Sequence, residues 1–184
     1  QGFLDGNSYI NKRLINGTIR NSNNYLPKID FNRIRNMYNL TFNDAEHKIT
    51  SNAIEHSFKE PTKVIMLEES STLQNLELKG NILLLCKQTL RIKNNTKIED
   101  CIIVAPTVEV ENGTNGNMQI FAMDTVWIGN NVTLNYPSVI CINRNNDSTL
   151  IHIGEHAEFY GELYAIHSGQ NRIGYNPNFE AKKN

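Results

Sequence analysis

The sequence predicts an all-β fold, a single-stranded parallel β-helix with coils of about 18 residues. Three observations predict this fold. Three consecutive blocks of eighteen residues align without a gap, each block begins with a short alternating strand, and each continues through a turn rich in Asn and Gly. A β-sandwich of short strands is the competing interpretation, but the strands of a sandwich do not repeat in sequence with a fixed period.

The three blocks share their apolar places as well as their length. They are TLRIKNNTKIEDCIIVAP (89–106), TVEVENGTNGNMQIFAMD (107–124) and TVWIGNNVTLNYPSVICI (125–142). Threonine holds the first place of each block, and an aliphatic residue the fourth: Thr89, Thr107, Thr125, and Ile92, Val110, Ile128. Because no block can bury its apolar side alone, the pattern predicts stacked coils around one continuous core. A right-handed coil is favoured, with the left-handed hexapeptide helix as the alternative.

The corner between the two strands of a block is polar. Asparagine holds the sixth place, and Asn or Gly the seventh: Asn94, Asn112, Asn130, and Asn95, Gly113, Asn131. These residue types adopt a left-handed backbone at low cost, as a tight corner requires. Stacked coils would place the asparagines in a ladder, where their side chains hydrogen-bond from coil to coil.

The domain organisation follows from where the period begins. We expect residues 71–184 to form the parallel β-helix and residues 1–70 to form a mixed, partly helical N-terminal appendage that caps it. Within the appendage, the apolar spacing of FNRIRNMYNLTF (31–42) and AEHKITSNAIEHSF (45–58) predicts one or two short helices. VIML (64–67) predicts a strand that leads into the coils.

Charge and cysteine usage exclude several classes of function. The chain of 184 residues has a formal net charge of −1, so nucleic acid is not an expected partner. Its three cysteines lie in apolar runs without CxxC spacing, which argues against a zinc site or a disulfide framework, and we expect no metal and no cofactor. The longest apolar run, ILLLC, is too short to span a bilayer. A membrane contact would require an anchor preceding Gln1.

One outward column of side chains is the strongest candidate for a binding surface. If the coils stack as expected, the third place of each block places Arg91, Glu109 and Trp127 on neighbouring rungs of one outer face. An exposed tryptophan either marks a contact surface or is covered by another segment. We expect the N-terminal appendage to cover Trp127. Tyr136 adds aromatic surface that suits a glycan or a protein partner.

Two enzyme classes remain as alternatives. The units IKNNTK, IGNNVT and IGEHAE resemble the hexapeptide motif of left-handed β-helix acyltransferases, which implies a catalytic histidine, and His152 and His156 are the candidates. A polysaccharide-cleaving β-helix enzyme would need clustered carboxylates, whereas Asp100, Glu109 and Asp124 are spread singly over different places. We therefore predict no catalytic residue.

The coils TLRIKNNTKIEDCIIV and TVWIGNNVTLNYPSVI resemble the small parallel β-helix of the bactofilin, or polymer-forming cytoskeletal, family. The likeness covers residues 71–166 and rests on the spacing of apolar residues. It implies a right-handed helix and self-assembly through uncapped ends. The chain is also similar to bacterial envelope proteins that carry a small β-helix outside a membrane anchor, which implies a periplasmic or cell-surface location.

These observations together predict a non-catalytic structural or binding module of the bacterial cell envelope. Such a module presents the flat faces of its stacked strands to a partner, which is a protein, a polymer, a glycan or a second copy of the chain.

Overall fold

The computed structural model describes residues 8–10, 13–16, 36, 45–144 and 150–167. The chain divides into two compact units, residues 1–30 and 31–184. In the first unit, strands β1 (Ser8–Ile10) and β2 (Arg13–Asn16) pair antiparallel. In the second unit, the described strands stack in parallel as a β-solenoid of about five turns. The predicted fold class is therefore confirmed.

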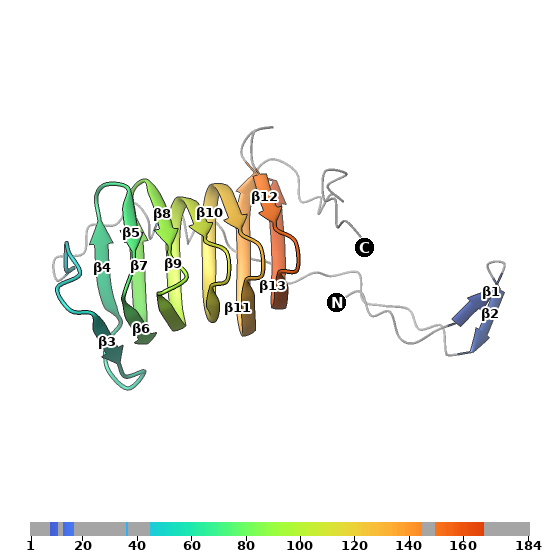
Figure 1. Cartoon of the computed structure of the whole chain (residues 1–184), viewed down its shortest axis with the longest axis horizontal. Helices are drawn as coiled ribbons and strands as arrows, with labels where there is room; N and C mark the ends of the chain where they lie inside the picture. Colours follow the sequence, from blue (N-terminus) through green and yellow to red (C-terminus); the bar gives the residue numbers. More distant parts are fainter. Residues whose placement is uncertain (1–7, 11–12, 17–35, 37–44, 145–149, 168–184) are drawn as a thin grey trace. The chain divides into compact units, whose positions relative to one another are not determined.

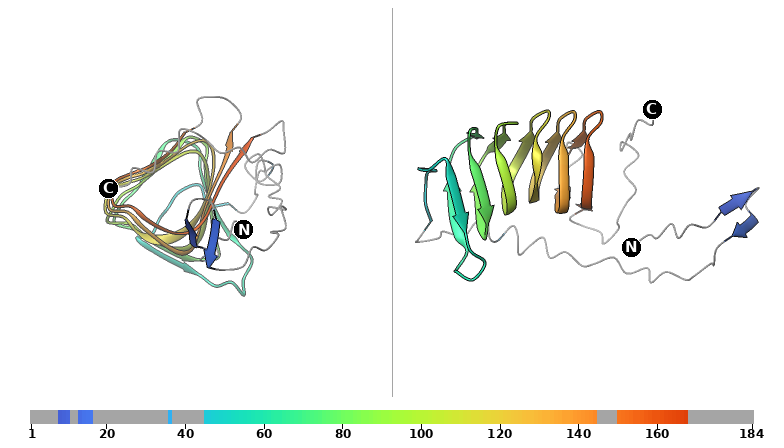
Figure 2. Two further views of the ribbon diagram at one scale, coloured as in Figure 1. Left: turned by 90° about the vertical axis from the view of Figure 1, so that its right-hand side faces the viewer. Right: turned by 60° about the horizontal axis from the view of Figure 1, so that its bottom comes forward.

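The solenoid strands follow one another along the chain from β3 to β13. They are β3 (Ala53–His56), β4 (Lys63–Leu67), β5 (Ser71–Leu73), β6 (Glu77–Gly80), β7 (Ile82–Cys86), β8 (Thr89–Ile92), β9 (Lys97–Val110), β10 (Asn115–Ile128), β11 (Thr133–Arg144), β12 (Leu150–Ile153) and β13 (Glu158–His167). Successive coils lie side by side along the solenoid axis (Figure 1). Down that axis the coils superimpose as a triangular outline (Figure 2).

The parallel pairing defines three sides of the triangle. The first side consists of 53–56, 77–80, 97–99, 115–117, 133–135 and 158–159. The second side consists of 63–67, 82–86, 101–105, 118–122, 138–142 and 161–165. The third side consists of 71–73, 89–92, 107–110, 125–128 and 150–153.

The register of the third side reproduces the sequence repeat. Thr107 lies between Thr89 and Thr125, and Val110 lies between Ile92 and Ile128. The fourth-place residues face inward and are at most 3% exposed. The eighteen-residue blocks are thus successive coils, as the sequence predicts.

Side chains that point inward from all three sides form one hydrophobic core. On the second side, Leu84, Ile103 and Ile120 lie on neighbouring coils and are 0% exposed. Burying one such aliphatic side chain stabilises the fold by about 1.5–3 kcal/mol relative to leaving it in water. Because every coil adds the same kind of rung, the core extends along the axis.

Asparagines link the coils at the corner after the third side. The Oδ1 of Asn112 accepts a hydrogen bond from the backbone N–H of Asn130 at 2.8 Å, and the Oδ1 of Asn130 accepts one from the N–H of Glu155 at 2.9 Å. The predicted asparagine ladder is therefore present, but these links run from side chain to backbone. The left-handed backbone is confirmed at Gly113 (φ 75°) and Asn131 (φ 54°).

The corner at Asn95 differs from the prediction. Asn75, one coil earlier, has the positive φ of 52°, whereas Asn95 is not among the described residues with positive φ. The Nδ2 of Asn95 donates a hydrogen bond to the Oδ1 of Asn75 at 2.8 Å, and the Oδ1 of Asn95 accepts one from the backbone N–H of Asn75 at 3.3 Å. At this corner the coils are therefore linked both from side chain to side chain and from side chain to backbone.

The helix predicted over 45–58 is wrong. Residues 45–144 and 150–167 contain strands, turns and bends and no helix. Glu46 forms an isolated parallel bridge with Ile65, and β3 pairs in parallel with β6, with Ile54 opposite Leu78. The backbone N–H and C=O groups of this first coil form hydrogen bonds with the next coil. This pairing outweighs the helical spacing of the apolar residues in 45–58. The parallel pairing therefore begins before residue 71.

The other two predictions for the N-terminal appendage have different outcomes. The helix predicted over 31–42 falls almost entirely outside the described residues. The strand predicted at 64–67 is confirmed as part of β4.

The three cysteines are free thiols buried in the solenoid. Cys86 and Cys101 belong to the interior core, whereas Cys141 alternates with the inward Ile140 and Ile142 and so faces outward on the second side. Burial raises the pKa of Cys101 and of Cys141 to about 12. A raised pKa disfavours the thiolate, so these thiols are poor nucleophiles in the folded chain.

Candidate functional site: an asparagine-lined groove

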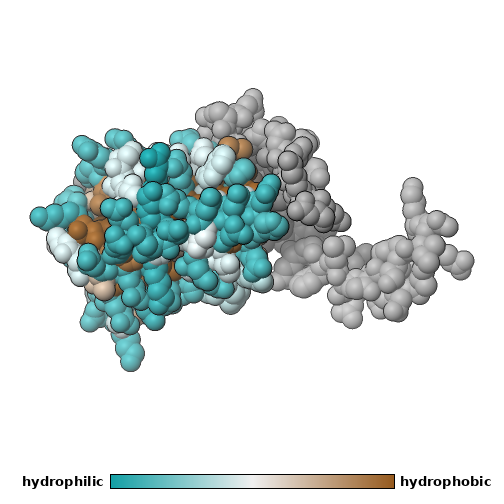
Figure 3. All heavy atoms as spheres, in the orientation of Figure 1, coloured by the Kyte–Doolittle hydropathy of each residue, from teal (hydrophilic) through white to brown (hydrophobic). Residues whose placement is uncertain are grey.

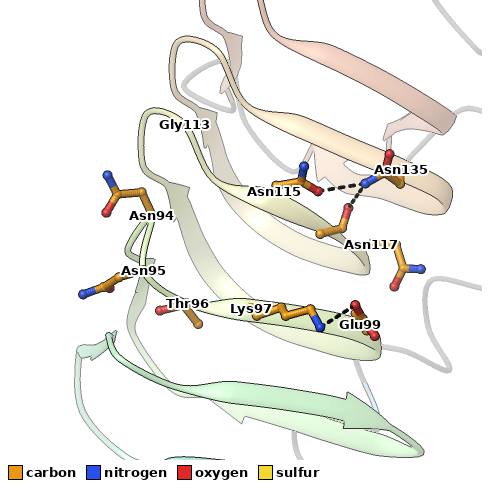
Figure 4. Close-up of a pocket in the computed structure, with 10 residues that line it drawn as sticks. Asn94, Asn95, Thr96, Lys97, Glu99, Gly113, Asn115, Asn117 and Asn135 are labelled. Carbon is orange, nitrogen blue, oxygen red and sulfur yellow. Dashed lines mark hydrogen bonds and ion pairs between the residues drawn. The ribbon is translucent and has the colours of Figure 1, made fainter.

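An open polar groove of about 560 Å³ runs along the first side of the solenoid and the corner that precedes it. Three successive coils contribute to it through β9, β10, β11 and the turns before β9 and β10. We call it the amide groove; its lining residues are Asn94, Asn95, Thr96, Lys97, Glu99, Gly113, Asn115, Gly116, Asn117 and Asn135 (Figure 4).

Strand alternation turns the asparagines of β10 outward. Asn115 and Asn117 flank Gly116, which faces the interior opposite Ile98 of β9 and Leu134 of β11. A Cβ at Gly116 would lie 2.5 Å from the carbonyl oxygen of Ile98, so only glycine allows the coils to approach this closely here. The glycine thus fixes the strand that presents the two outward amides.

Hydrogen bonds hold three amide side chains of the groove in place. The Nδ2 of Asn135 donates to the Oδ1 of Asn115 at 2.9 Å, as drawn in Figure 4, and the Oδ1 of Asn117 accepts from the backbone N–H of Asp100 at 2.5 Å. Within the described part of the chain, these contacts leave the Nδ2 groups of Asn115 and Asn117 and the Oδ1 of Asn135 without a partner. The groove therefore offers oriented donors and acceptors on neutral side chains.

Charged residues form the other end of the groove. The Nζ of Lys97 lies 3.1 Å from a carboxylate oxygen of Glu77 and 3.0 Å from one of Glu99, and the Nζ of Lys79 lies 3.0 Å from Glu99. The hydrogen bond from Lys97, followed by that from Lys79, holds the pKa of Glu99 below its usual value. Because each of these charges is paired, this end also presents hydrogen-bonding groups without a strong field of one sign.

The structure brings the predicted column together on the third side. Glu109 lies between Arg91 and Trp127 in the register, and the Nε of Arg91 is 2.5 Å from the Oε2 of Glu109. His152 follows Trp127 on the next coil, and the two rings stack with centroids 3.7 Å apart and planes at 19°. We call these four residues the outer column. Trp127 is 43% exposed. Most of residues 1–44 of the appendage that we expected to cover it lie outside the described residues.

The other two predicted residues lie apart from the column. Tyr136, 80% exposed, precedes the second side on β11. His156 lies in the turn between β12 and β13 with a φ of 55°. Among the described residues, no hydrogen bond or ring contact joins His156 to His152.

Sequence reasoning did not find the amide groove. Its signal was present in TNGNMQ (114–119), where Gly and Asn replace the aliphatic spacing of the neighbouring coils. In sequence this segment interrupts a hexapeptide pattern, although in the structure it places two amides beside Asn135 of the next coil.

The surface of the solenoid seen in Figure 3 is mostly hydrophilic, with isolated hydrophobic spots.

No group of three or more His, Cys, Asp or Glu residues that could hold a metal ion occurs among the residues that the structure describes. The same residues include no helix that is long and apolar enough to cross a membrane. The chain matches no protein-family model, no curated protein and no solved structure.

Proposed function

We propose that this chain is a non-catalytic binding module that holds a hydroxyl-rich polymer, a glycan, along the amide groove. The observation that carries the proposal is the groove of about 560 Å³ that asparagines from three successive coils line. A bacterial envelope location is part of the proposal, because polysaccharides surround the cell there.

The chemistry of the groove suits hydroxyl groups. A hydroxyl both donates and accepts a hydrogen bond, and a neutral primary amide offers both functions side by side. Each such bond contributes only about 0.5–1.5 kcal/mol, so a polymer that contacts several coils at once gains more than a small sugar does. Neighbouring coils are about 4.8 Å apart, a spacing close to the length of one pyranose unit in an extended glycan.

The scaffold also reduces the cost of binding. The groove side chains project from strands and tight turns that pair with coils on both sides, and hydrogen bonds orient three of the amides before a ligand arrives. A preorganised site loses less side-chain entropy on binding than a flexible site does. A repetitive strand face therefore fits a repetitive ligand.

Calorimetric titration of the full chain with soluble polysaccharides tests the proposal. The panel contains a neutral glucan, a xylan, a chitin oligosaccharide and an acidic uronan. For the polysaccharide that binds, the double variant Asn94→Ala, Asn115→Ala should bind about 10-fold more weakly, as expected for the loss of two hydrogen bonds. The matched control Asn52→Ala removes an exposed asparagine outside the groove and should leave the affinity unchanged. Equal affinity of all three proteins, or no binding to any polymer of the panel, would contradict the proposal.

A protein contact through the outer column is the second candidate function. The observation that favours it is the 43% exposure of Trp127 beside the Arg91–Glu109 ion pair, because exposed Trp and Arg are enriched where proteins bind tightly. Trp127→Ala should abolish capture of such a partner without loss of folding, whereas Thr125→Ala, two residues earlier on the same outward side, should not. If Trp127→Ala captures the partner as well as the unaltered chain does, this candidate fails.

Self-association through an end of the solenoid is a separate candidate, which the likeness to bactofilins implies. β13 is the last strand in the pairing order of the sheet, where its only described partner is β11, and an unpaired strand edge is a template for another chain. Filaments in electron micrographs would support polymer formation. A stable trimer in sedimentation, with His152 or His156 in a cleft between subunits, would instead support the acyltransferase alternative.

A further inference from the structure

A second, smaller hollow of about 210 Å³ lies at the corner between the first and second sides of the solenoid. We call it the corner trough; its lining includes Phe58, Asn81, Asp100, Ile102, Gln119 and Pro137. Pockets that enclose a whole small molecule measure roughly 300–1,000 Å³. The corner trough therefore suits one substituent or one unit of a larger ligand.

The corner trough adjoins the amide groove. Glu99 lines the groove, and the next residue, Asp100, lines the trough. On the following coil, Asn117 lines the groove and Met118 the trough. Glu99 and Asn117 lie at the same end of the groove (Figure 4), and the Oδ1 of Asn117 accepts a hydrogen bond from the N–H of Asp100 at 2.5 Å. A polymer in the groove therefore has the trough beside it, within reach of its side groups.

The trough has apolar walls. Ile102 and Gln119 are opposite each other in the register of β9 and β10. Both face outward, because the residues before and after each of them belong to the interior core. Pro137 of β11 adds an exposed ring, and Phe58, 66% exposed, adds an aromatic ring from the turn between β3 and β4. These side chains offer contact to a small apolar group.

Hydrogen bonds hold the turn that carries Phe58 against the next coil. The Nδ2 of Asn81 donates to the carbonyl oxygen of Glu60 at 2.9 Å, and the Oδ1 of Asn81 accepts from the hydroxyl of Thr62 at 3.0 Å. Within the turn, the N–H of Glu60 donates to the carbonyl of Ser57 at 3.1 Å. The aromatic wall of the trough is thus positioned before a ligand arrives.

The trough also contains two polar groups that are available to a ligand. Among the residues that the structure describes, no hydrogen bond or ion pair involves the carboxylate of Asp100 or the side-chain amide of Gln119. A carboxylate accepts hydrogen bonds, whereas the Nε2 of a glutamine donates them. The lining of the trough includes no Lys or Arg, so an acidic group of a ligand would meet the charge of Asp100 without a cation to balance it. The trough thus favours a neutral group with one donor and one acceptor.

We propose that the corner trough binds the acetamido group of an N-acetylated amino sugar, and that the polymer in the amide groove belongs to this class. An acetamido group combines a methyl group, an N–H donor and a carbonyl acceptor. Its methyl group contacts Ile102 and Phe58, its N–H donates to the carboxylate of Asp100, and its carbonyl accepts from the Nε2 of Gln119. This inference rests on the proposed function, because the trough selects among the polymers that the amide groove holds.

Calorimetric titration of the full chain with chitotetraose and cellotetraose tests the inference. The two tetrasaccharides have the same linkage, and they differ only in the acetamido group that replaces one hydroxyl of each unit. Chitotetraose should bind about 10-fold more tightly, because it gains two hydrogen bonds and an apolar contact in the trough. Equal affinities that the double variant Asn94→Ala, Asn115→Ala still weakens would overturn this inference and leave the proposed function standing. Binding of neither tetrasaccharide would overturn the inference, and it would contradict the proposed function as well if no polymer of the panel binds.

Two variants locate the preference in the trough. Gln119→Glu keeps the size of the side chain but removes the donor, so the preference for chitotetraose should fall below about 2-fold. Phe58→Ala, in an exposed turn, should reduce the preference while circular dichroism shows an unchanged fold. The control Gln88→Glu makes the same charge change at an exposed position outside the groove and the trough, and should keep the full preference. An unchanged preference in either trough variant, or an equal loss in the control, would overturn the inference.

Discussion

Replacing Ile120 by alanine is expected to lower the free energy of unfolding by about 2–5 kcal/mol, and replacing it by aspartate is expected to unfold the solenoid. Ile120 is 0% exposed and lies between Ile103 of β9 and Ile140 of β11. Alanine leaves a cavity shared by three coils, since the neighbouring strands are hydrogen-bonded in place and cannot close it. Aspartate leaves a charge without a partner in the core.

Urea denaturation followed by circular dichroism measures both effects. Asp124→Ala, on the same strand β10 but at an exposed position, is the matched control and should change the free energy of unfolding by no more than about 0.5 kcal/mol. If Ile120→Ala were as mild as the control, the inward direction of residue 120 would be wrong, and with it the register of the second side.

The second large effect is expected at Gly80, where the first side ends. A Cβ at this position would lie 2.0 Å from the backbone carbonyl oxygen of His56 in the preceding coil, and the φ of Gly80 is +95°. Alanine therefore causes both a backbone clash and an unfavourable conformation. We expect Gly80→Ala to lower the free energy of unfolding by more than the roughly 1–2 kcal/mol that the conformation alone costs.

Gly113→Ala is the control that separates the two causes. Gly113 also has a positive φ, of +75°, but no neighbouring atom lies within 4 Å of the place that a Cβ would take, so its loss should be the conformational cost alone, about 1–2 kcal/mol. Denaturation midpoints of the two variants give the difference that close stacking of the coils adds. Equal losses in the two variants would contradict the close approach of β6 to β3.

The sequence predicts the central coils well because their residues must satisfy the same condition in every turn. The side chain of Val110 is buried where it lies level with Ile92 and Ile128. The eighteen-residue sequence repeat therefore predicts the pairing register of the strands directly. The edge coil at 45–58 lacks this redundancy. Its apolar residues fit a helix as well as a strand, and only pairing with β6 decides between them.

The amide groove depends on information that a single block does not contain. Asn115 and Asn135 hydrogen-bond at 2.9 Å because the pairing of β10 with β11 sets Gly116 opposite Leu134 and turns the flanking residues outward. The sequence shows that these residues are polar, but not that they line one groove. The adjacency of Arg91, Glu109 and Trp127 could be predicted because the third places of their blocks are equivalent and uninterrupted.

The second side of the solenoid is apolar on its outer surface as well as on its inner one, and this has a signal that is visible in the sequence. The runs ILLLC (82–86) and CIIV (101–104) have no polar residue at alternate places, and such runs are typical of parallel strands buried on both surfaces. The alternation in β8, where Thr89 and Arg91 face outward, is typical of a strand buried on one surface. The contrast between the two runs and β8 is consistent with a second side that is buried on both surfaces and a third side that is buried on one.

The amide groove as a polymer site is the central claim, and nuclear magnetic resonance tests it most directly. In a titration of the ¹⁵N-labelled full chain with the polysaccharide that binds in calorimetry, the backbone and side-chain amide signals of residues 94–97, 113–117 and 135 should shift together and saturate at one ligand concentration. Signals of the outer column should stay in place. Shifts that centre on Trp127 and His152 and leave the groove asparagines unchanged would contradict the claim.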